Sequence, residues 1–354
     1  MEPVTNMVFV IIALFVATLA SVLSWQFGHL VKRFGIVDRP DGVRKIQSTP
    51  VARLGGVAIF LAILVFFLLE WLIFTLRPKS DEPGEIAYWL YASRPYQIVL
   101  GVSLFAFLIG LWDDIGSAPT KLKLALLAAA AVTAAYFGLH PDALNSPFGD
   151  VTVPVALITG SALWLLVFTN ATNFMDGSNG LSIGSLAVML IGLAIISAVV
   201  DDVRLHLGWF ALFGAMTGFL MHNLRGTLYA GDAGALGLGA LFASLGLVSG
   251  LEVWTVATLA LPFLIDVLLT LIWRAKHKRS WLEPHRDHAY QRLIEGGWSH
   301  IEAAVLYWGL SASCAVAALI AAKAGGEAPF VIFWTLTFAG IVMWSLNRRE
   351  YRGQ

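Results

Sequence analysis

The chain consists largely of long apolar runs, separated by short polar or glycine- and proline-containing stretches. The runs are roughly 18–24 residues long, which suits a helix crossing about 30 Å of hydrocarbon, whereas strands of a membrane barrel alternate over about ten residues. Only 13% of the 354 residues are charged, and a soluble protein has about 25%. The sequence therefore predicts an all-α, polytopic integral membrane protein.

Eleven runs are predicted to span the membrane, and at ~20 residues each they occupy most of the chain. We therefore expect a single transmembrane domain over residues 1–354. The first run is predicted to be a span and not a cleaved signal, because no basic segment precedes it. The predicted spans lie near residues 7–27, 54–76, 95–112, 122–139, 152–169, 180–200, 206–222, 233–249, 252–273, 301–322 and 328–346.

The basic residues predict how the spans are oriented. Eleven spans put the two termini on opposite faces, and one face has almost all of the 23 Lys and Arg residues. By the positive-inside rule this face is cytoplasmic, so the N-terminus is expected outside and the C-terminus inside. The longest cytoplasmic loop is predicted over 274–300. The other face has only Arg77, Lys79, Arg94, Arg204 and Lys323.

Four polar clusters are predicted on the cytoplasmic face, and polar groups at membrane depth usually mark function. The first is the pair Asp113 and Asp114, followed by Lys121 and Lys123. Two carboxylates 4 Å apart repel by up to ~4 kcal/mol at an effective dielectric near 20, so the pair needs a cation or a shared proton. A solvated helix end with local pairing of acids and lysines explains this cluster equally well.

The second cluster lies between the fifth and sixth spans. Asn170, Asn173 and Asp176 recur at every third position, so a continuing helix would present them along one face. Gly177 and Gly180 then allow a sharp turn and a close approach of the backbone to a ligand. A plain turn needs fewer such residues, so the pattern favours a functional site.

The third cluster, Gly231–Gly239, opens the eighth span. Small residues at every third position let helices pack closely, which explains the glycines but not Asp232. An acid in the first turn of a helix either caps the helix dipole or binds a metal. The sequence leaves both interpretations open.

The fourth cluster is the basic loop, which contains His285 and His288. On a helix both imidazoles would face one way, with Arg292 one turn further on. The positive-inside rule explains the basic residues of the loop but not its histidines. Paired histidines also bind zinc, but the loop has neither a His-Glu-x-x-His motif nor a cysteine, so zinc is not favoured.

Together the clusters combine carboxylates with Lys, Arg and His on one face. Carboxylate oxygens suit a hard cation such as Mg²⁺, and Mg²⁺ with these basic groups suits a diphosphate. The pattern therefore indicates phosphoryl transfer at the inner membrane surface. A secondary transporter is the alternative of another class, but transporters place coupling acids near the midplane in repeated, broken helices. A non-catalytic scaffold leaves the assembled acids unexplained.

In this order the clusters resemble those of the polyprenyl-phosphate N-acetylhexosamine-1-phosphate transferases, the superfamily of MraY and WecA within glycosyltransferase family 4. The similarity extends over most of the chain. The matching motifs are the Asp-Asp pair with a lysine (Asp113, Asp114, Lys121), Asn-x-x-Asn-x-x-Asp-Gly (Asn170, Asn173, Asp176, Gly177), Gly-Asp-x-Gly (Gly231, Asp232, Gly234) and a basic, Thr-Pro and Gly-Gly stretch over 44–56.

Two departures bear on the substrate. Asn179 stands where relatives usually have an aspartate, and the histidine motif over 285–291 replaces the clustered histidines of MraY and WecA. This histidine motif is similar to that of the WbpL-like branch, which builds O-antigen and related surface glycans. An MraY-type phospho-MurNAc-pentapeptide transferase of peptidoglycan synthesis is therefore the alternative and not the first choice.

The resemblance implies a bacterial inner-membrane enzyme with its active site on the cytoplasmic face. It would transfer sugar-1-phosphate from a UDP-N-acetylhexosamine of the GlcNAc, FucNAc or QuiNAc type to undecaprenyl phosphate, releasing UMP and initiating a surface glycan such as O-antigen. Membrane lipid and a second copy of the chain are the other implied partners, and no nucleic acid is expected.

The resemblance also implies roles for individual residues. Asp232 and Asp176 are expected to bind Mg²⁺, or Mn²⁺ in its place, with Asp114 shaping the same site. Asp113 would accept a proton from the lipid phosphate or orient it. Asp266 resembles an intramembrane aspartate of WecA-like relatives, or is a structural buried acid. The groups expected to neutralise phosphate are Lys121, His285, Arg286 and His288, and the other expected substrate contacts are Lys45, Arg53, Asn170, Asn173, Gly177 and Asn179.

Overall fold

The computed structural model describes residues 2–39, 50–76, 94–200, 207–280, 283 and 285–350. Each of the eleven predicted spans corresponds to one long helix, so the all-α polytopic prediction is confirmed. The long helices are α1 (Glu2–Lys32), α2 (Gly55–Leu76), α4 (Arg94–Gly116), α5 (Thr120–Tyr136), α6 (Pro154–Phe174), α7 (Leu181–Val200), α8 (Leu207–Asn223), α9 (Gly231–Val248), α10 (Val253–Lys276), α12 (His300–Ala324) and α13 (Ala328–Glu350).

Among the described helices, nine are long and apolar enough to cross a membrane. The other two long helices, α5 and α8, have 17 residues each and lie in the same bundle. Several helices extend beyond their predicted spans, and two of these extensions contain residues of the polar clusters, since α4 continues to Gly116 and α6 to Phe174. The Asp-Asp pair and the two asparagines of the second cluster are therefore helical.

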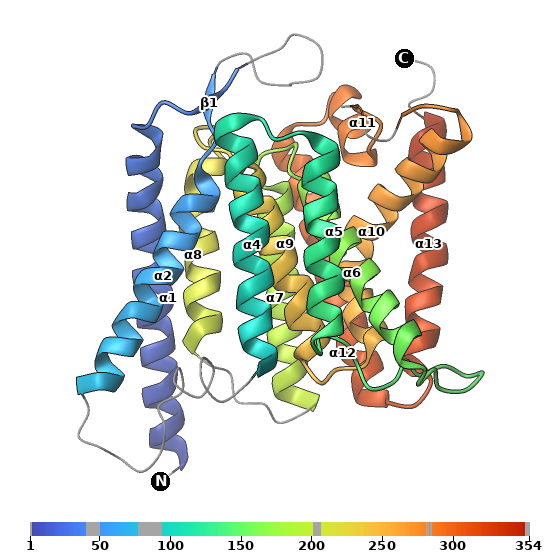
Figure 1. The fold of residues 1–354 in the computed structure, drawn as a ribbon, viewed down its shortest axis with the longest axis horizontal. Coiled ribbons are helices and arrows are strands. Elements are labelled where there is room, and N and C mark those ends of the chain that lie inside the picture. The colour runs from blue at the N-terminus through green and yellow to red at the C-terminus, as the bar shows by residue number, and fades with distance from the viewer. Residues whose placement is uncertain are drawn as a thin grey trace.

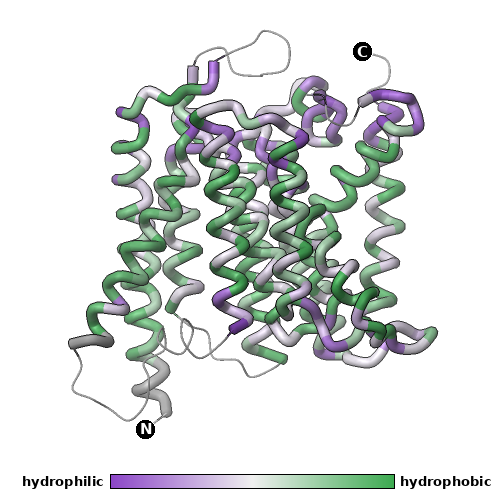
Figure 2. Tube along the Cα trace, in the orientation of Figure 1, coloured by the Kyte–Doolittle hydropathy of each residue, from purple (hydrophilic) through white to green (hydrophobic). Residues whose placement is uncertain are grey.

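The helices run along one another, and α1 begins at the end of the bundle opposite to the end where α13 finishes (Figure 1). A short helix, α11 (Ala289–Glu295), lies at the second of these ends. Figure 2 shows apolar residues along the helices and hydrophilic residues gathered at this end, which we call the α11 end. The positive-inside rule predicts that the α11 end is cytoplasmic.

Glycines bring three helices into near-backbone contact at the α11 end. A Cβ atom on Gly56 of α2 would overlap the backbone of Gly234 in α9, and one on Gly110 of α4 would overlap the backbone at Asp232. The packing explanation of the glycine-rich motif is thus confirmed. These contacts also fix the start of α9 against the end of α4, where the acids lie.

Two short strands place the segment before α2. β1 (Val37–Asp38) pairs antiparallel with β2 (Val51–Ala52), and Ala52 also bridges to Leu228. Gly55 N donates to Tyr229 O at 2.8 Å, and Gly56 N donates to Ala230 O at 2.7 Å. The chain over 51–56 is therefore held beside the start of α9. Lys45, predicted as a substrate contact, lies outside the described residues.

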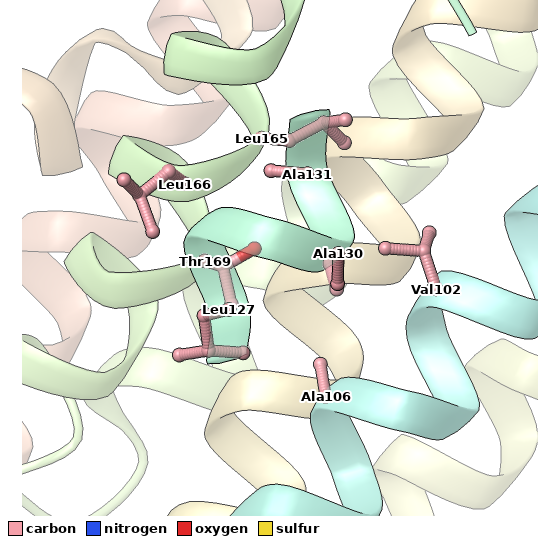
Figure 3. A pocket seen from close by; sticks show the side chains of 9 residues that line it. Val102, Ala106, Leu127, Ala130, Ala131, Leu165, Leu166 and Thr169 are labelled. Carbon is pink, nitrogen blue, oxygen red and sulfur yellow. The ribbon is translucent and has the colours of Figure 1, made fainter. Parts of the chain in front are cut away.

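The described helices enclose two cavities of very different size, and the larger one, of about 450 Å³, is mostly apolar and lies between α2, α4, α8 and α9. Where α4, α5, α6 and α9 meet, a mostly apolar cavity has a volume of about 10 Å³ (Figure 3). Such a volume corresponds to about one water molecule, so this cavity is not a substrate site. The cavity is lined by Val102, Ala106, Leu127, Ala130, Ala131, Leu165, Leu166, Thr169 and Ala240.

Candidate active site

The two adjacent acids of α4 have different partners. Asp114 is buried, and its carboxylate accepts from the backbone N–H groups of Asp232 and Ala233, each at 3.0 Å. These N–H groups belong to the first turn of α9, where a helix has donors without intrahelical partners and carries positive dipole charge. Asp114 therefore caps α9 and fixes that helix to the end of α4.

Asp113 and Asp232 share one cation. Lys123 Nζ lies 2.9 Å from Asp113 Oδ2 and 2.5 Å from Asp232 Oδ2. The other oxygen of Asp113 accepts from Ala118 N at 2.7 Å, in the turn between α4 and α5. We call Asp113, Asp232 and Lys123 the acidic cluster.

The lysine at the acidic cluster is not the one that the motif comparison selected. Lys121 lies in the first turn of α5 and is exposed, whereas Lys123 lies two residues further on and is mostly buried. Two positions along a helix turn a side chain by about 200°, since a turn takes 3.6 residues. The structure therefore replaces Lys121 with Lys123 as the phosphate-neutralising candidate.

Asp232 lies in the first turn of α9, and its carboxylate is directed to side chains of other helices. Besides Lys123, its carboxylate accepts from Asn173 Nδ2 at 3.0 Å, and α9 has no side-chain cap bond from its own N-terminal residue. Because Asp114 already caps α9, the side chain of Asp232 is available for a cation. Asn173, in the last turn of α6, joins the second cluster to the third.

Asp176 follows the end of α6 and so does not extend the helical face of Asn170 and Asn173. Its side chain is partly buried near the acidic cluster. Loss of water around the carboxyl, together with the charges of Asp232 and Asp114, raises the pKa of Asp176 well above its usual value. A carboxyl in this setting favours either a proton or a nearby cation.

Three other residues of the second cluster have local contacts. Asn170 Nδ2 donates to Leu166 O at 2.8 Å within α6. A Cβ atom on Gly177 would overlap the hydroxyl of Tyr290, which donates to Phe174 O at 3.0 Å. The absence of a side chain at Gly177 thus leaves room for Tyr290 of α11. The sequence had predicted close approach to a ligand and not this contact. Asn179 is half-buried near Gly226.

Arg53 was predicted to contact substrate, and it stabilises the end of α4 instead. Its Nε donates to Asp114 O at 2.9 Å, and its Nη2 donates to the carbonyls of both Asp113, at 3.0 Å, and Asp114. A guanidinium at the carbonyl end of a helix satisfies unpaired acceptors and complements the negative end of the dipole. Arg53 therefore fixes the backbone that carries both acids.

The histidines lie before α11 and not on a helix, which corrects the helical expectation. Their rings are nevertheless 5.0 Å apart, and both lie near Phe174, with centroid distances of 6.4 Å for His285 and 5.7 Å for His288. Phe174 directly follows Asn173, so the histidine loop lies beside the acidic cluster. Arg292 points elsewhere, because its Nε donates to Asn347 of α13 at 2.9 Å.

His285 is neutral at pH 7. Burial lowers its pKa to about 4, and the electrostatic interactions with His288 and Arg274 act in the same direction. Its Nδ1 accepts from Asp287 N at 3.3 Å, so Nε2 carries the proton, and Nε2 is buried with no hydrogen-bond partner among the described residues. His285 can therefore offer a hydrogen bond to a phosphate oxygen but not the positive charge predicted for it.

Two acids hold the histidine loop, the buried Asp266 and the partly buried Asp287. Asp266 of α10 accepts from Ala289 N at 2.7 Å and from the Tyr307 hydroxyl at 2.6 Å, and it lies 3.5 Å from His288. It caps α11, which supports its structural interpretation. Asp287, which sequence reasoning did not single out, is contacted by four cationic or imidazole side chains: Arg274, Arg279, Arg348 and His285. The sequence feature that could have indicated Asp287 is its position as an acid within a basic loop.

Arg286 is half-exposed, with Nη1 3.9 Å from Glu295 Oε1. It lies between the two histidines in the sequence. Of the predicted phosphate-neutralising groups in the histidine loop, Arg286 is the one that combines a fixed charge with partial exposure to solvent.

The donor set fits a divalent cation. Within the described ranges, no group of three or more His, Cys, Asp or Glu side chains is arranged to hold a metal. Mg²⁺ in proteins, however, commonly uses one or two carboxylates and completes its shell with waters and substrate phosphates. Asp113 Oδ2 and Asp232 Oδ2 already share one cation, so these two oxygens are suitably placed to be its protein ligands.

Fold and site together define a polytopic helical membrane protein with an acidic cluster at one end, in which two aspartates contact one lysine. Residues 96–250 match the family model for glycosyl transferase family 4. The chain is 24% identical over 351 residues to the probable undecaprenyl-phosphate N-acetylglucosaminyl 1-phosphate transferase of Bacillus subtilis, covering 94% of this chain and 91% of that relative.

The names of two further relatives specify a different lipid or a different sugar donor. The chain is 28% identical over 312 residues to the decaprenyl-phosphate N-acetylglucosaminephosphotransferase of Mycobacterium leprae, covering 79% of this chain and 75% of the relative. It is 26% identical over 306 residues to the phospho-N-acetylmuramoyl-pentapeptide-transferase of Listeria welshimeri, covering 79% and 87%. The names of these relatives and the family model match the superfamily that the motifs indicated, the polyprenyl-phosphate N-acetylhexosamine-1-phosphate transferases. The place of the chain in the WbpL-like branch stays a prediction.

Proposed function

We propose that this protein transfers sugar-1-phosphate from a UDP-N-acetylhexosamine to undecaprenyl phosphate, with Mg²⁺, on the cytoplasmic face of the bacterial inner membrane. The observation that carries the proposal is the acidic cluster at one end of the membrane bundle, in which Asp113 and Asp232 both contact the ammonium of Lys123. The names of the relatives support a polyprenyl phosphate acceptor and a sugar phosphate donor.

The reaction exchanges one phosphoanhydride for another. An oxygen of the lipid phosphate attacks the phosphorus that is linked to the sugar, the bond from that phosphorus to the UMP oxygen breaks, and UMP leaves. The exchange is therefore nearly isoergic and reversible. A phosphate monoester is largely ionised at pH 7, with a second pKa of about 6, so positioning and electrostatics contribute more than a general base.

The residues of the site divide this work. Asp232 and Asp113 would hold Mg²⁺, with Asp176 beside them, and Mg²⁺ supplies positive charge to the diphosphate. Asn173 orients Asp232, and His285 Nε2–H, which is buried beside Phe174 without a partner among the described residues, would donate to a phosphate oxygen, with Arg286 supplying positive charge. Asp114 and Arg53 hold the backbone at the start of α9 and at the end of α4.

The direct test uses purified protein with labelled UDP-GlcNAc, undecaprenyl phosphate and Mg²⁺. We expect a chloroform-soluble labelled product, release of UMP in equal amount, loss of both with EDTA, and reversal by excess UMP. Asp232→Asn should abolish the product, and Lys276→Met, at an exposed position of α10, should not. Absence of UMP release with every UDP-sugar offered would refute the proposal.

The pentapeptide transferase activity is the second candidate, because relatives with that name match the chain over much of its length. A donor panel distinguishes the two activities: UDP-GlcNAc, UDP-GalNAc, UDP-FucNAc and UDP-QuiNAc against UDP-MurNAc-pentapeptide. We expect turnover with an N-acetylhexosamine donor, which would assign the protein to initiation of a surface glycan such as O-antigen. Turnover restricted to the pentapeptide donor would assign it to peptidoglycan synthesis.

A further inference from the structure

Lys123 occupies the position in which a divalent cation would contact both acids. Its ammonium lies within 2.9 Å of Asp113 Oδ2 and 2.5 Å of Asp232 Oδ2, and only 15% of its side chain is exposed. No other side-chain partner of Lys123 is found in the part of the chain that the structure describes. A metal that binds both Oδ2 atoms must therefore replace this ammonium.

The two acids are the fixed part of this arrangement. The second oxygen of Asp113 is held by Ala118 N at 2.7 Å, and that of Asp232 by Asn173 Nδ2 at 3.0 Å. Their backbones are held as well, since Asp114 caps α9 and Arg53 binds the carbonyls at the end of α4. Lys123 reaches the same point from α5 on a flexible four-carbon stem, so it is the component that can move.

We propose that Lys123 is an internal counter-ion, which neutralises Asp113 and Asp232 in the metal-free protein and is displaced when a divalent cation binds. Displacement places a free ammonium next to the newly bound cation. Like charges repel, so the ammonium turns towards the nearest anion, which in the loaded site is the diphosphate of the donor. The second half of this proposal rests on the proposed function, whereas the first half concerns the metal alone.

The contacts of Lys123 indicate when a divalent cation can replace its ammonium. A divalent cation entering without substrate must break two charge-assisted hydrogen bonds and leave the ammonium without a partner, which opposes binding. A cation entering with a diphosphate provides the ammonium with a new anion. Metal and nucleotide are therefore expected to bind cooperatively, and the substrate-free protein is expected to bind metal weakly.

The test measures metal binding to the substrate-free protein. Binding of Mn²⁺ is followed by the electron paramagnetic resonance signal of the free ion, for wild type, Lys123→Met and the control Lys276→Met. We expect Lys123→Met to bind Mn²⁺ on the order of tenfold more tightly than wild type, because the competing hydrogen bonds are gone. Lys276→Met should match wild type. Equal or weaker binding by Lys123→Met overturns the proposal.

A second measurement needs no variant. Wild-type protein is treated with an amine-reactive reagent with and without Mn²⁺, and modification of Lys123 is quantified by mass spectrometry against the exposed Lys276. We expect Mn²⁺ to increase modification of Lys123 severalfold relative to Lys276. Unchanged or lower modification of Lys123 refutes displacement.

The two proposals can fail separately. If Mn²⁺ releases Lys123 but no UDP-sugar is turned over, the counter-ion proposal stands and the proposed function fails. If the protein transfers sugar phosphate while Lys123→Met binds Mn²⁺ no more tightly than wild type, only the counter-ion proposal fails.

Discussion

Asp114 and Asp232 are both acids of the same site, yet replacing Asp114 should destabilise the protein and replacing Asp232 should not. Asp114 is 4% exposed and accepts two backbone N–H groups of α9, each at 3.0 Å. Hydrogen bonds to a charged group contribute about 1.5–3 kcal/mol each, and an N-cap contributes about 0.5–2 kcal/mol in total. Because the two bonds share one carboxylate, we take about 3 kcal/mol as the expected loss for Asp114→Ala.

The assay is the melting temperature of the purified protein in detergent. A loss of this size corresponds to a decrease of roughly 5–10 °C. The matched variant is Asp232→Asn, in which the amide oxygen still accepts from Lys123 or Asn173 and the cap of α9 remains, so its melting temperature should stay close to that of wild type. Both variants should be inactive. Equal melting temperatures for Asp114→Ala and wild type would refute the capping role, as would a larger decrease for Asp232→Asn.

Three further predictions concern other parts of the site. Lys123→Met should lower turnover by at least tenfold and Lys121→Met by less than threefold, measured as UMP release; a reversed order would return the role to Lys121. His285 has a folded pKa of about 4, below the value of about 6.5 for an unfolded histidine, so the unfolded chain binds more protons and stability falls as pH decreases from about 6.5 to about 4. Melting temperatures across this window should therefore decline less steeply for His285→Gln than for wild type, and parallel curves would contradict the neutral assignment. Gly177→Ala should lower activity because its methyl group overlaps the Tyr290 hydroxyl, and Tyr290→Phe in the same chain should restore part of it; no restoration would place the strain elsewhere.

The spans could be predicted from sequence because hydropathy depends on composition within each run and not on partners. All eleven runs became helices, and only their polar ends were underestimated. Asp113 and Gly110 lie inside α4, because a polar residue at a helix end does not interrupt the hydrogen bonds of the helix backbone. The acids that the sequence grouped together also lie near one another in the structure, and their role as an active site stays a prediction.

The division of labour among these acids could not be read from the sequence. Asp114 and Asp232 are 118 residues apart, and which of them caps α9 depends on how close α4 and α9 approach. The choice of lysine depended on the turn before α5, where Ser117 has a positive φ of 56° and Pro119 precedes the first residue of the helix. Helical spacing alone did not reveal that turn. Similarly, α11 starts after both histidines because Asp266, from α10, binds the first N–H groups of α11.

Asp114 caps the start of α9, and Arg53 caps the end of α4. These two caps determine where the site can adapt to its substrate. Moving the end of α4 would break the bonds of Arg53 to its carbonyls and expose the first donors of α9 at the same time. The ends of α4 and α9 are therefore the rigid side of the site, and substrates of different size bind against them without backbone movement. Accommodation is left to the opposite side, to the Lys123 side chain and the loop before α11, where a change of sugar specificity could evolve without dismantling the chemistry.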